Sequence, residues 1–154
     1  EITNSGHEFN YRKFTKKQIS SLLKLSKFLI KKYRINLKNI LGHSDIAPER
    51  KKDPGEKFPW QYLSQNKVGL WHAIKKQDLI KNRKIKTTKV DKDLFINNLS
   101  KIGYQKKTPR NLGKIKYLDY IIKAFQRRYR QDLIDGKIDQ ECLIISKNLI
   151  KKFY

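Results

Sequence analysis

The sequence predicts an α/β unit followed by a small all-α unit of three helices. Two short segments, residues 1–3 and 39–41, are typical of strands, and an amphipathic stretch between them is typical of a helix that covers one face of a sheet. From residue 91 onward, only helical patterns recur. These three observations indicate a mixed sheet with flanking helices in the first half and a helical bundle in the second.

The first helix is predicted from about Thr15 to Tyr33. Thr15-Lys16-Lys17-Gln18 is a capping-box pattern, in which the threonine and glutamine side chains satisfy backbone N–H groups of the first turn. Apolar residues then recur at helical spacing, namely Ile19, Leu22, Leu23, Leu29, Ile30 and Tyr33. A loop is expected over residues 36–39 and a short helix near residues 60–63.

A polar, lysine-rich stretch separates the two units. Residues 72–90 carry few apolar side chains and no clear period, which is typical of a linker, with one short helix expected near residues 73–80. The predicted organisation is therefore residues 1–71, the linker, and a helical unit over residues 91–154.

Helix signals define the second unit. Asp91 is a good N-cap residue, and Gly103 is a typical end of the helix that it would begin. A second amphipathic helix is predicted over residues 117–130. Asp135-Gly136 indicates a turn, after which Asp139 would cap the last helix.

Composition restricts the function classes. The 154 residues contain 37 Lys and Arg against 14 Asp and Glu, and the net charge of +23 would attract most polyanions. The lysines are spread along the chain, and no helix-turn-helix, RNP-type strand or zinc-finger spacing accompanies them, so a specific nucleic-acid site is not expected. Non-specific nucleic-acid binding stays open as an alternative on charge alone. No apolar run is long enough to span a membrane. The single cysteine, Cys142, excludes an internal disulfide and is expected to be a buried thiol on a helix.

The loop over residues 40–60 holds the candidate chemistry. It is rich in Pro, Gly and charged residues and lies between apolar flanks, as functional loops often do. His43 and Asp53 are candidate ligands of Zn²⁺, because imidazole and carboxylate groups both suit this ion. Their spacing does not show that they converge, and an ordinary loop histidine and aspartate is the alternative. Asp53-Pro54-Gly55 is a turn that could direct the carboxylate.

The stretch Gly42 to Trp60, GHSDIAPERKKDPGEKFPW, resembles the zinc-ligand signature of the type-2 N-acetylmuramoyl-L-alanine amidases, the AmpD and AmiD family. Gly6-His7-Glu8-Phe9 and Val68-Gly69-Leu70-Trp71 are similar to flanking parts of the AmiD-like branch. The resemblance covers about the first 71 residues. It implies a mixed sheet flanked by helices, and hydrolysis of the amide that joins the lactyl group of N-acetylmuramic acid to L-alanine in peptidoglycan or its muropeptides.

The resemblance also implies site residues. His43 and Asp53 match two of the three zinc ligands of the family. Lys51 matches the lysine that stabilises the oxyanion, and Glu1 matches the proposed general base. This chemistry is coherent, because zinc polarises a carbonyl, a carboxylate accepts a proton and a fixed ammonium group stabilises the developing negative charge.

The third zinc ligand of the family is a histidine on a strand well before that glutamate. The resemblance therefore implies that this chain corresponds to the C-terminal part of an amidase with an incomplete sheet. His7 and His72 are alternative sources of a third ligand, although His7 matches a family position outside the ligand set. A catalytically inactive remnant that only binds peptidoglycan is accordingly the second functional hypothesis.

A second resemblance covers about residues 91–152. Ile102-Gly103-Tyr104, Ala124-Phe125-Gln126-Arg127 and the stretch Ile134 to Asp139 are similar to motifs of the three-helix peptidoglycan-binding domain. An ordinary helical bundle with Phe125 in its core is the alternative. Together, the two resemblances favour the cell envelope as the location, with the cytoplasm as the alternative.

Overall fold

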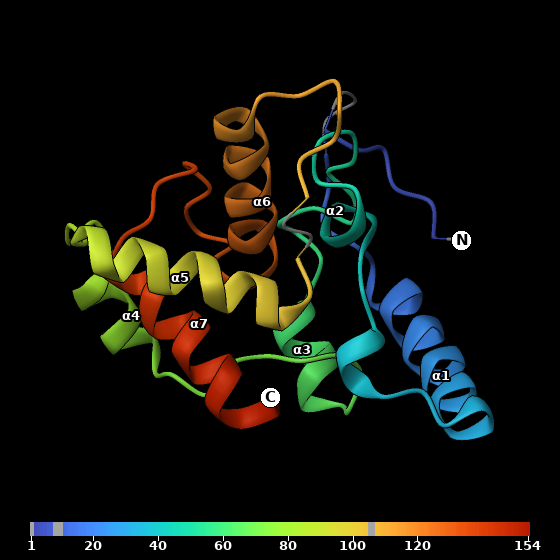
Figure 1. The fold of residues 1–154 in the computed structure, drawn as a ribbon. Coiled ribbons are helices and arrows are strands. Elements are labelled where there is room, and N and C mark those ends of the chain that lie inside the picture. The colour runs from blue at the N-terminus through green and yellow to red at the C-terminus, as the bar shows by residue number, and fades with distance from the viewer. Residues whose placement is uncertain (1, 8–10, 105–106) are drawn as a thin grey trace.

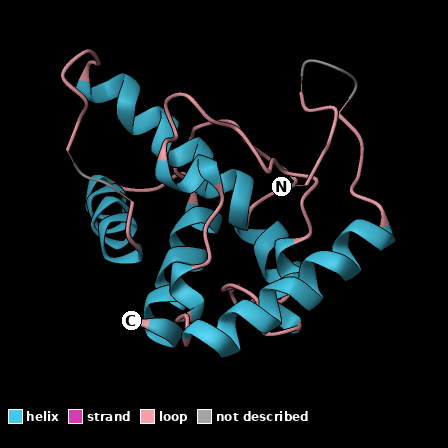
Figure 2. Cartoon of the chain, turned by 90° about the vertical axis from the view of Figure 1, so that its right-hand side faces the viewer, coloured by secondary structure: helices cyan, strands magenta, loops and turns pink. Residues whose placement is uncertain are grey.

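The computed structural model describes residues 2–7, 11–104 and 107–154. The helices are α1 (Lys16–Tyr33), the 3₁₀ helix η1 (Leu37–Asn39), α2 (His43–Ile46), α3 (Trp60–Gln65), α4 (Lys76–Asn82), α5 (Lys89–Ile102), α6 (Lys114–Tyr129) and α7 (Gln140–Phe153). Figures 1 and 2 show these helices joined by loops. Across the described ranges there is no strand, and the β-type pairing there is an isolated antiparallel bridge between Lys86 and Asp139.

The predicted α/β class is therefore wrong for the described residues, and the hydrogen bonds of the two expected strands show why. The Ile40 N–H donates to the Leu37 carbonyl at 3.3 Å within a turn. The Ile40 carbonyl accepts from Arg128 Nη2 at 2.9 Å. In the first segment, the Thr3 carbonyl accepts from Gln18 Nε2 at 2.7 Å. Turn and side-chain groups thus take the place of a neighbouring strand, without which a short apolar segment does not form a ladder.

The larger hydrophobic core lies among α5, α6 and α7. The two helices α5 and α7 pack along one another, and α4 packs on α7 (Figure 1). Phe95 and Phe125 are fully buried and meet edge to face, with ring centroids 5.1 Å apart. Cys142 is buried in the same core, as the sequence predicts. Further buried members include Leu99, Tyr104, Tyr117, Ile121, Ile122, Ala124, Tyr129, Leu143, Ile145 and Leu149.

A smaller core supports the loop that carries the candidate chemistry. It joins the apolar stripe of α1 to the end of that loop and to α3, through Ile19, Leu23, Phe58, Trp60, Leu63 and Val68. Trp71 packs against both cores. The two halves of the chain are therefore in contact through the partly buried side chain of Trp71.

Most predicted helix ends are confirmed. Thr15 forms the expected capping box, Gly103 ends α5 in the left-handed conformation and Asp139 caps α7. The predicted N-cap of α5, Asp91, is wrong. Thr88 caps the helix, and Asp91 is its capping-box partner in the first turn.

Two other expectations differ in detail. The loop over residues 40–60 contains the short helix α2, which its composition did not indicate, and the helix expected near residues 73–80 is α4. In the part of the chain that the structure describes, no helix is long and apolar enough to cross a bilayer.

Candidate active site

The structure brings the two predicted zinc ligands together. His43 is the first residue of α2, and its Nδ1 atom lies 2.5 Å from Asp53 Oδ2. The Ser44 N–H donates to the Asp53 carbonyl at 2.9 Å, which ties the start of α2 to the segment that carries the aspartate. Both side chains are largely exposed, at 72% for His43 and 56% for Asp53, so the pair is open to a ligand from solution.

A glycine allows this approach. An added Cβ at Gly42 would lie 2.5 Å from Pro54 Cδ and 3.4 Å from the Trp60 ring. No side chain fits there unless the backbone moves, because such a distance is far inside van der Waals contact. Gly42 therefore lets the segment before His43 pass directly over the proline that follows Asp53.

Tyr11 supports the turn on its other side. Its hydroxyl donates to the Pro54 carbonyl at 2.6 Å and accepts from the Lys57 N–H at 3.1 Å. Gly55 has a φ of +80°, and an added Cβ would lie 2.5 Å from the same hydroxyl. Burial raises the pKa of Tyr11 to about 12, so the hydroxyl keeps the proton that it donates. The turn carrying Asp53 is held by fixed groups on both sides.

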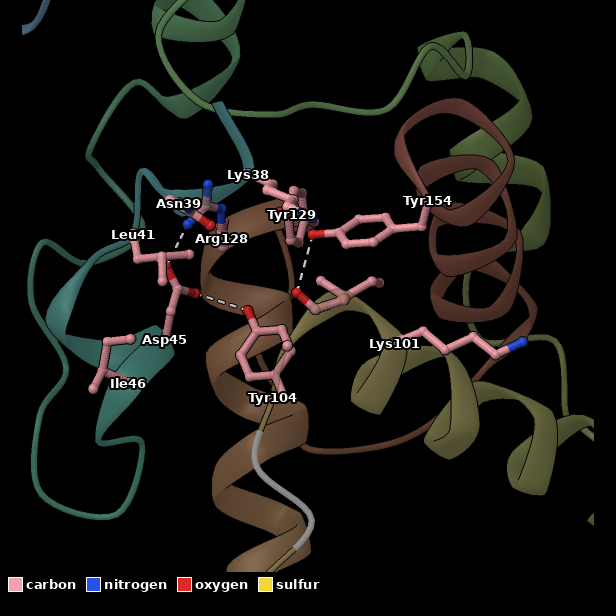
Figure 3. A pocket seen from close by; sticks show the side chains of 12 residues that line it. Lys38, Asn39, Leu41, Asp45, Ile46, Lys101, Tyr104, Arg128, Tyr129 and Tyr154 are labelled. Atoms are coloured by element: carbon pink, nitrogen blue, oxygen red, sulfur yellow. Dashed lines mark hydrogen bonds and ion pairs between the residues drawn. The ribbon is translucent and has the colours of Figure 1, made fainter. Parts of the chain in front are cut away.

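A buried ion pair between Asp45 and Arg128 joins α2 to α6. Asp45 Oδ2 accepts from the Gly42 N–H at 2.8 Å and from Arg128 Nη1 on α6, and Asp45 Oδ1 accepts from the Tyr104 hydroxyl at 2.8 Å (Figure 3). The Arg128 guanidinium also lies 4.1 Å from the Trp60 ring centroid. Burial raises the pKa of Tyr104 well above its usual value, which keeps this hydroxyl a donor. The second half of the chain thus fixes the helix on which His43 lies.

Sequence reasoning did not find this network. Asp45 and Arg128 are 83 residues apart, and Arg128 stands among other arginines, Arg127 and Arg130, so no local pattern indicates the pair. The cavity drawn in Figure 3, of about 250 Å³, lies beside this ion pair and contains neither Lys51 nor Asp53.

Lys51 and Asp53 line a larger cavity of about 770 Å³. One wall is the loop that carries them, and the facing wall is α6, through Tyr120, Lys123 and Arg127. The Lys51 N–H donates to the Ala47 carbonyl at 2.9 Å, which fixes the backbone of the turn, while its side chain is exposed. Candidate catalytic groups therefore share one space with the helical half of the chain.

The other predicted residues are placed differently. Glu1, the predicted general base, lies outside the described residues. His7 lines the same cavity as Asp53, but its Nε2 atom pairs with Glu56 Oε2 at 2.9 Å. His72 is buried against Trp71, with ring centroids 4.9 Å apart, and does not line the cavity.

The donor set fits part of a zinc site. A histidine nitrogen and a carboxylate oxygen that lie close together and are exposed to solvent are suitable zinc ligands. A catalytic zinc site, however, takes three protein ligands. Among residues 2–7, 11–104 and 107–154, no group of three His, Cys, Asp or Glu side chains is placed to hold a metal ion. His43 and Asp53 could accordingly supply two of the ligands.

Residues of the second resemblance have structural roles here. Gln126 is fully buried: its Oε1 atom accepts from the Gly136 N–H at 2.9 Å, and its Nε2 atom donates to the Lys137 carbonyl at 2.9 Å. Phe125 is a core residue, as the bundle alternative predicted. The Ala-Phe-Gln motif and the Asp-Gly turn are therefore joined by packing and hydrogen bonds.

Comparison with known proteins agrees with the signature in the loop. The family described as N-acetylmuramoyl-L-alanine amidase matches residues 1–56. The amidase AmiD of Escherichia coli is 34% identical over 161 residues, which cover 99% of this chain and 56% of AmiD. The amidase AmpD of Haemophilus influenzae is 45% identical over 60 residues, covering 38% of this chain and 33% of that protein. The chain spans about half the length of AmiD.

Solved structures agree with the sequences. The structure of AmiD from Escherichia coli, in complex with the substrate anhydro-N-acetylmuramic acid-L-Ala-D-gamma-Glu-L-Lys, matches with a TM-score of 0.76 and 31% identity over 98% of this chain and 58% of that one. AmpDH3 from Pseudomonas aeruginosa matches with a TM-score of 0.75 and 28% identity over 94% of this chain and 56% of that one. By sequence and by structure, the chain belongs to the AmpD- and AmiD-like family of type-2 amidases.

Proposed function

We propose that the protein is a zinc-dependent N-acetylmuramoyl-L-alanine amidase that acts in peptidoglycan turnover. It would hydrolyse the amide between the lactyl group of N-acetylmuramic acid and L-alanine. The observation that carries the proposal is the pairing of His43 with Asp53 at 2.5 Å, within the segment that matches the amidase family. The substrate class is inferred from AmiD, whose structure holds an anhydro-muropeptide.

The residues of the chain divide the chemistry between them. His43 and Asp53 would hold zinc, which when bound polarises the scissile carbonyl and acidifies water. Lys51 would place its ammonium group near the carbonyl oxygen as negative charge develops there, since its side chain faces the cavity and belongs to the same turn as Asp53. Glu1 would accept the proton of the attacking water and return it to the departing alanine amine.

The helical half would help to form the substrate-binding surface. We propose the division into residues 1–71, a linker over 72–90 and a peptidoglycan-binding-like unit over 91–154. The second wall of the 770 Å³ cavity comes from α6, which supports a role for this unit in holding substrate. A location in the cell envelope follows from such a substrate and belongs to the same proposal.

The alternative is a chain that binds peptidoglycan without hydrolysing it. The resemblance of residues 91–152 to a peptidoglycan-binding domain supports this alternative, and the described part of the chain contributes two converging zinc donors, His43 and Asp53. Zinc content distinguishes the two hypotheses. An amidase should retain close to one zinc per chain after dialysis against a weak chelator, and a binding protein should not.

The decisive experiment is an assay of the hydrolysis of anhydro-N-acetylmuramic acid-L-Ala-D-γ-Glu-L-Lys, in which the released tripeptide is measured. Activity should require zinc, and His43→Ala and Asp53→Ala should each abolish it while peptidoglycan binding is retained. Both side chains are largely exposed, so neither change should unfold the protein. Unchanged turnover in either variant would refute the assignment.

A further inference from the structure

The cavity that contains Lys51 and Asp53 is large enough for a peptide. Its volume of about 770 Å³ lies within the range of ordinary ligand sites. On α6, Tyr120, Lys123 and Arg127 line it at helical spacings of three and four residues, which places them on one face of the helix. These residues lie outside the segment that matches the amidase family, residues 1–56.

Arg127 is exceptional among the buried and half-buried arginines of the second half. Arg128 pairs with Asp45, Arg130 pairs with Asp139 at 2.5 Å, and Arg83 pairs with Glu141 at 2.7 Å. Arg127 is half-buried and forms no ion pair or hydrogen bond with any described residue. Its Nε atom is buried without a partner, as are those of Arg128 and Arg130, but those two arginines have ion pairs through their other nitrogens. Burial lowers the pKa of Arg127, but an arginine stays charged at any physiological pH.

A half-buried charge without a partner is costly, and an anion from solution would remove that cost. Lys123 lies one turn earlier on α6, although it is already paired with Asp119 at 2.8 Å. From the loop side the cavity is lined by two carboxylates, Glu49 and Asp53, and by three cations, Arg50, Lys51 and Lys52. Cations therefore outnumber carboxylates in the lining, so the cavity attracts an anion, and Arg127 is the half-buried cation of the α6 wall that such an anion could pair with.

We propose that Arg127, assisted by Lys123, forms a carboxylate-binding subsite for the peptide part of the substrate. The inference rests on the proposed function, because that function supplies the ligand. A stem of the sequence L-Ala-D-γ-Glu-L-Lys has a free α-carboxylate on the γ-linked glutamate and another at its terminus. A planar guanidinium group binds a carboxylate through two parallel hydrogen bonds, so it can orient the stem while the amide lies near Lys51.

The test compares Arg127→Gln with the unaltered protein in binding the tripeptide L-Ala-D-γ-Glu-L-Lys and a tripeptide whose glutamate α-carboxylate and C-terminus are both amides. Calorimetry should show that Arg127→Gln weakens binding of the free acid about 10- to 100-fold. The diamide should bind weakly to both proteins alike. Lys116→Gln is the matched control, since Lys116 is an exposed cation on α6 that does not line the cavity.

Kinetics separate the subsite from the proposed function. If the protein hydrolyses the muropeptide, Arg127→Gln should raise KM by a similar factor and leave kcat nearly unchanged. Hydrolysis with an unaltered KM in this variant would overturn the subsite and leave the amidase intact. Preference for the acid over the diamide without hydrolysis would overturn the amidase and leave the subsite intact. Equal binding of the free acid and the diamide by the unaltered protein would also overturn the subsite. So would competition by millimolar inorganic phosphate that is as strong in Arg127→Gln as in the unaltered protein.

Discussion

Arg128 on α6 and Asp45 on α2 form an ion pair that is almost completely buried, with 3% and 5% of the two side chains exposed. Asp45 lies two residues after His43, so the charge that fixes this short helix comes from the other half of the chain. The guanidinium also reaches the Ile40 carbonyl and the face of Trp60. The candidate zinc ligand is therefore positioned by tertiary contacts as well as by its own loop.

Removing the arginine from this pair should lower the stability of the folded protein. Arg128→Met leaves the Asp45 carboxylate buried without its cation, and we expect the free energy of unfolding to fall by about 3–5 kcal/mol in urea titrations. The neighbouring variant Arg127→Gln is the control and should change it by less than about 1 kcal/mol, because Arg127 has no partner among the described residues.

The double variant Asp45→Asn/Arg128→Met tests the cause. It removes both charges, and it should recover part of the loss seen in Arg128→Met because no uncompensated charge stays buried. An amide at position 45 can still accept from the Gly42 N–H, as the carboxylate does at 2.8 Å. A double variant that is less stable than Arg128→Met would show that packing, and not charge, dominates at this contact.

Gly42→Ala should disturb the meeting of His43 and Asp53. The added methyl group would lie 2.5 Å from Pro54 Cδ, whereas the φ of −92° suits any residue, so the effect is steric. We expect a loss of about 1–3 kcal/mol in the free energy of unfolding and a changed NMR resonance of the His43 ring.

Gly113→Ala is the matched control for that change. Gly113 also has an ordinary φ, of −73°, and an added Cβ would meet nothing within 4 Å. Because Gly113 is an N-cap residue, its replacement by alanine should lower the free energy of unfolding by less than about 1 kcal/mol. Equal effects of the two substitutions would contradict the steric account of Gly42.

Local signals explain what the sequence could predict. Thr15 with Gln18, Gly103 and Asp139 act within one helical turn, and their roles in helix ends are confirmed. The placement of the α5 N-cap failed for a related reason: Thr88 and Asp91 form one reciprocal pair, and either residue type can cap a helix.

Long-range partners explain what the sequence could not predict. The sequence of the segment Asn39 to Leu41 is typical of a strand. In the structure, however, the Ile40 carbonyl accepts a hydrogen bond from Arg128, and the described residues form no ladder beside the segment. The convergence of His43 with Asp53 depends on Gly42, Pro54 and Asp45, none of which follows from spacing. The roles of His43, Lys51, Asp53 and Glu1 in catalysis stay predictions.

His72 should make the stability depend on pH. The residue is 7% exposed, and burial lowers the pKa of its imidazole to about 4, against an ordinary value of 6.5. Between pH 4 and 6.5 the unfolded chain therefore binds a proton that the folded protein does not, so the free energy of unfolding falls as the pH falls through this range. The full loss would be about 3 kcal/mol.

A variant without the imidazole isolates this contribution. Urea titrations from pH 7 to pH 4 should show a smaller decline in His72→Leu than in the unaltered protein, because the titrating carboxylates are common to both. The difference between the two curves should grow below about pH 6.5 and level off near pH 4, the two pKa values of the group. Parallel curves would mean that folded His72 titrates normally.

Lys51→Ala should lower the rate of hydrolysis without removing zinc. If the ammonium group stabilises the oxyanion, its loss should reduce kcat by about 100- to 1,000-fold, as for other oxyanion donors. Lys52→Ala is the control, since it removes the same charge from the next residue of the same exposed loop. The measurement is kcat on the muropeptide together with zinc per chain. A Lys51→Ala protein that has lost its zinc would assign the lysine a structural role, and equal kcat values for the two variants would mean that only the net charge of the loop matters.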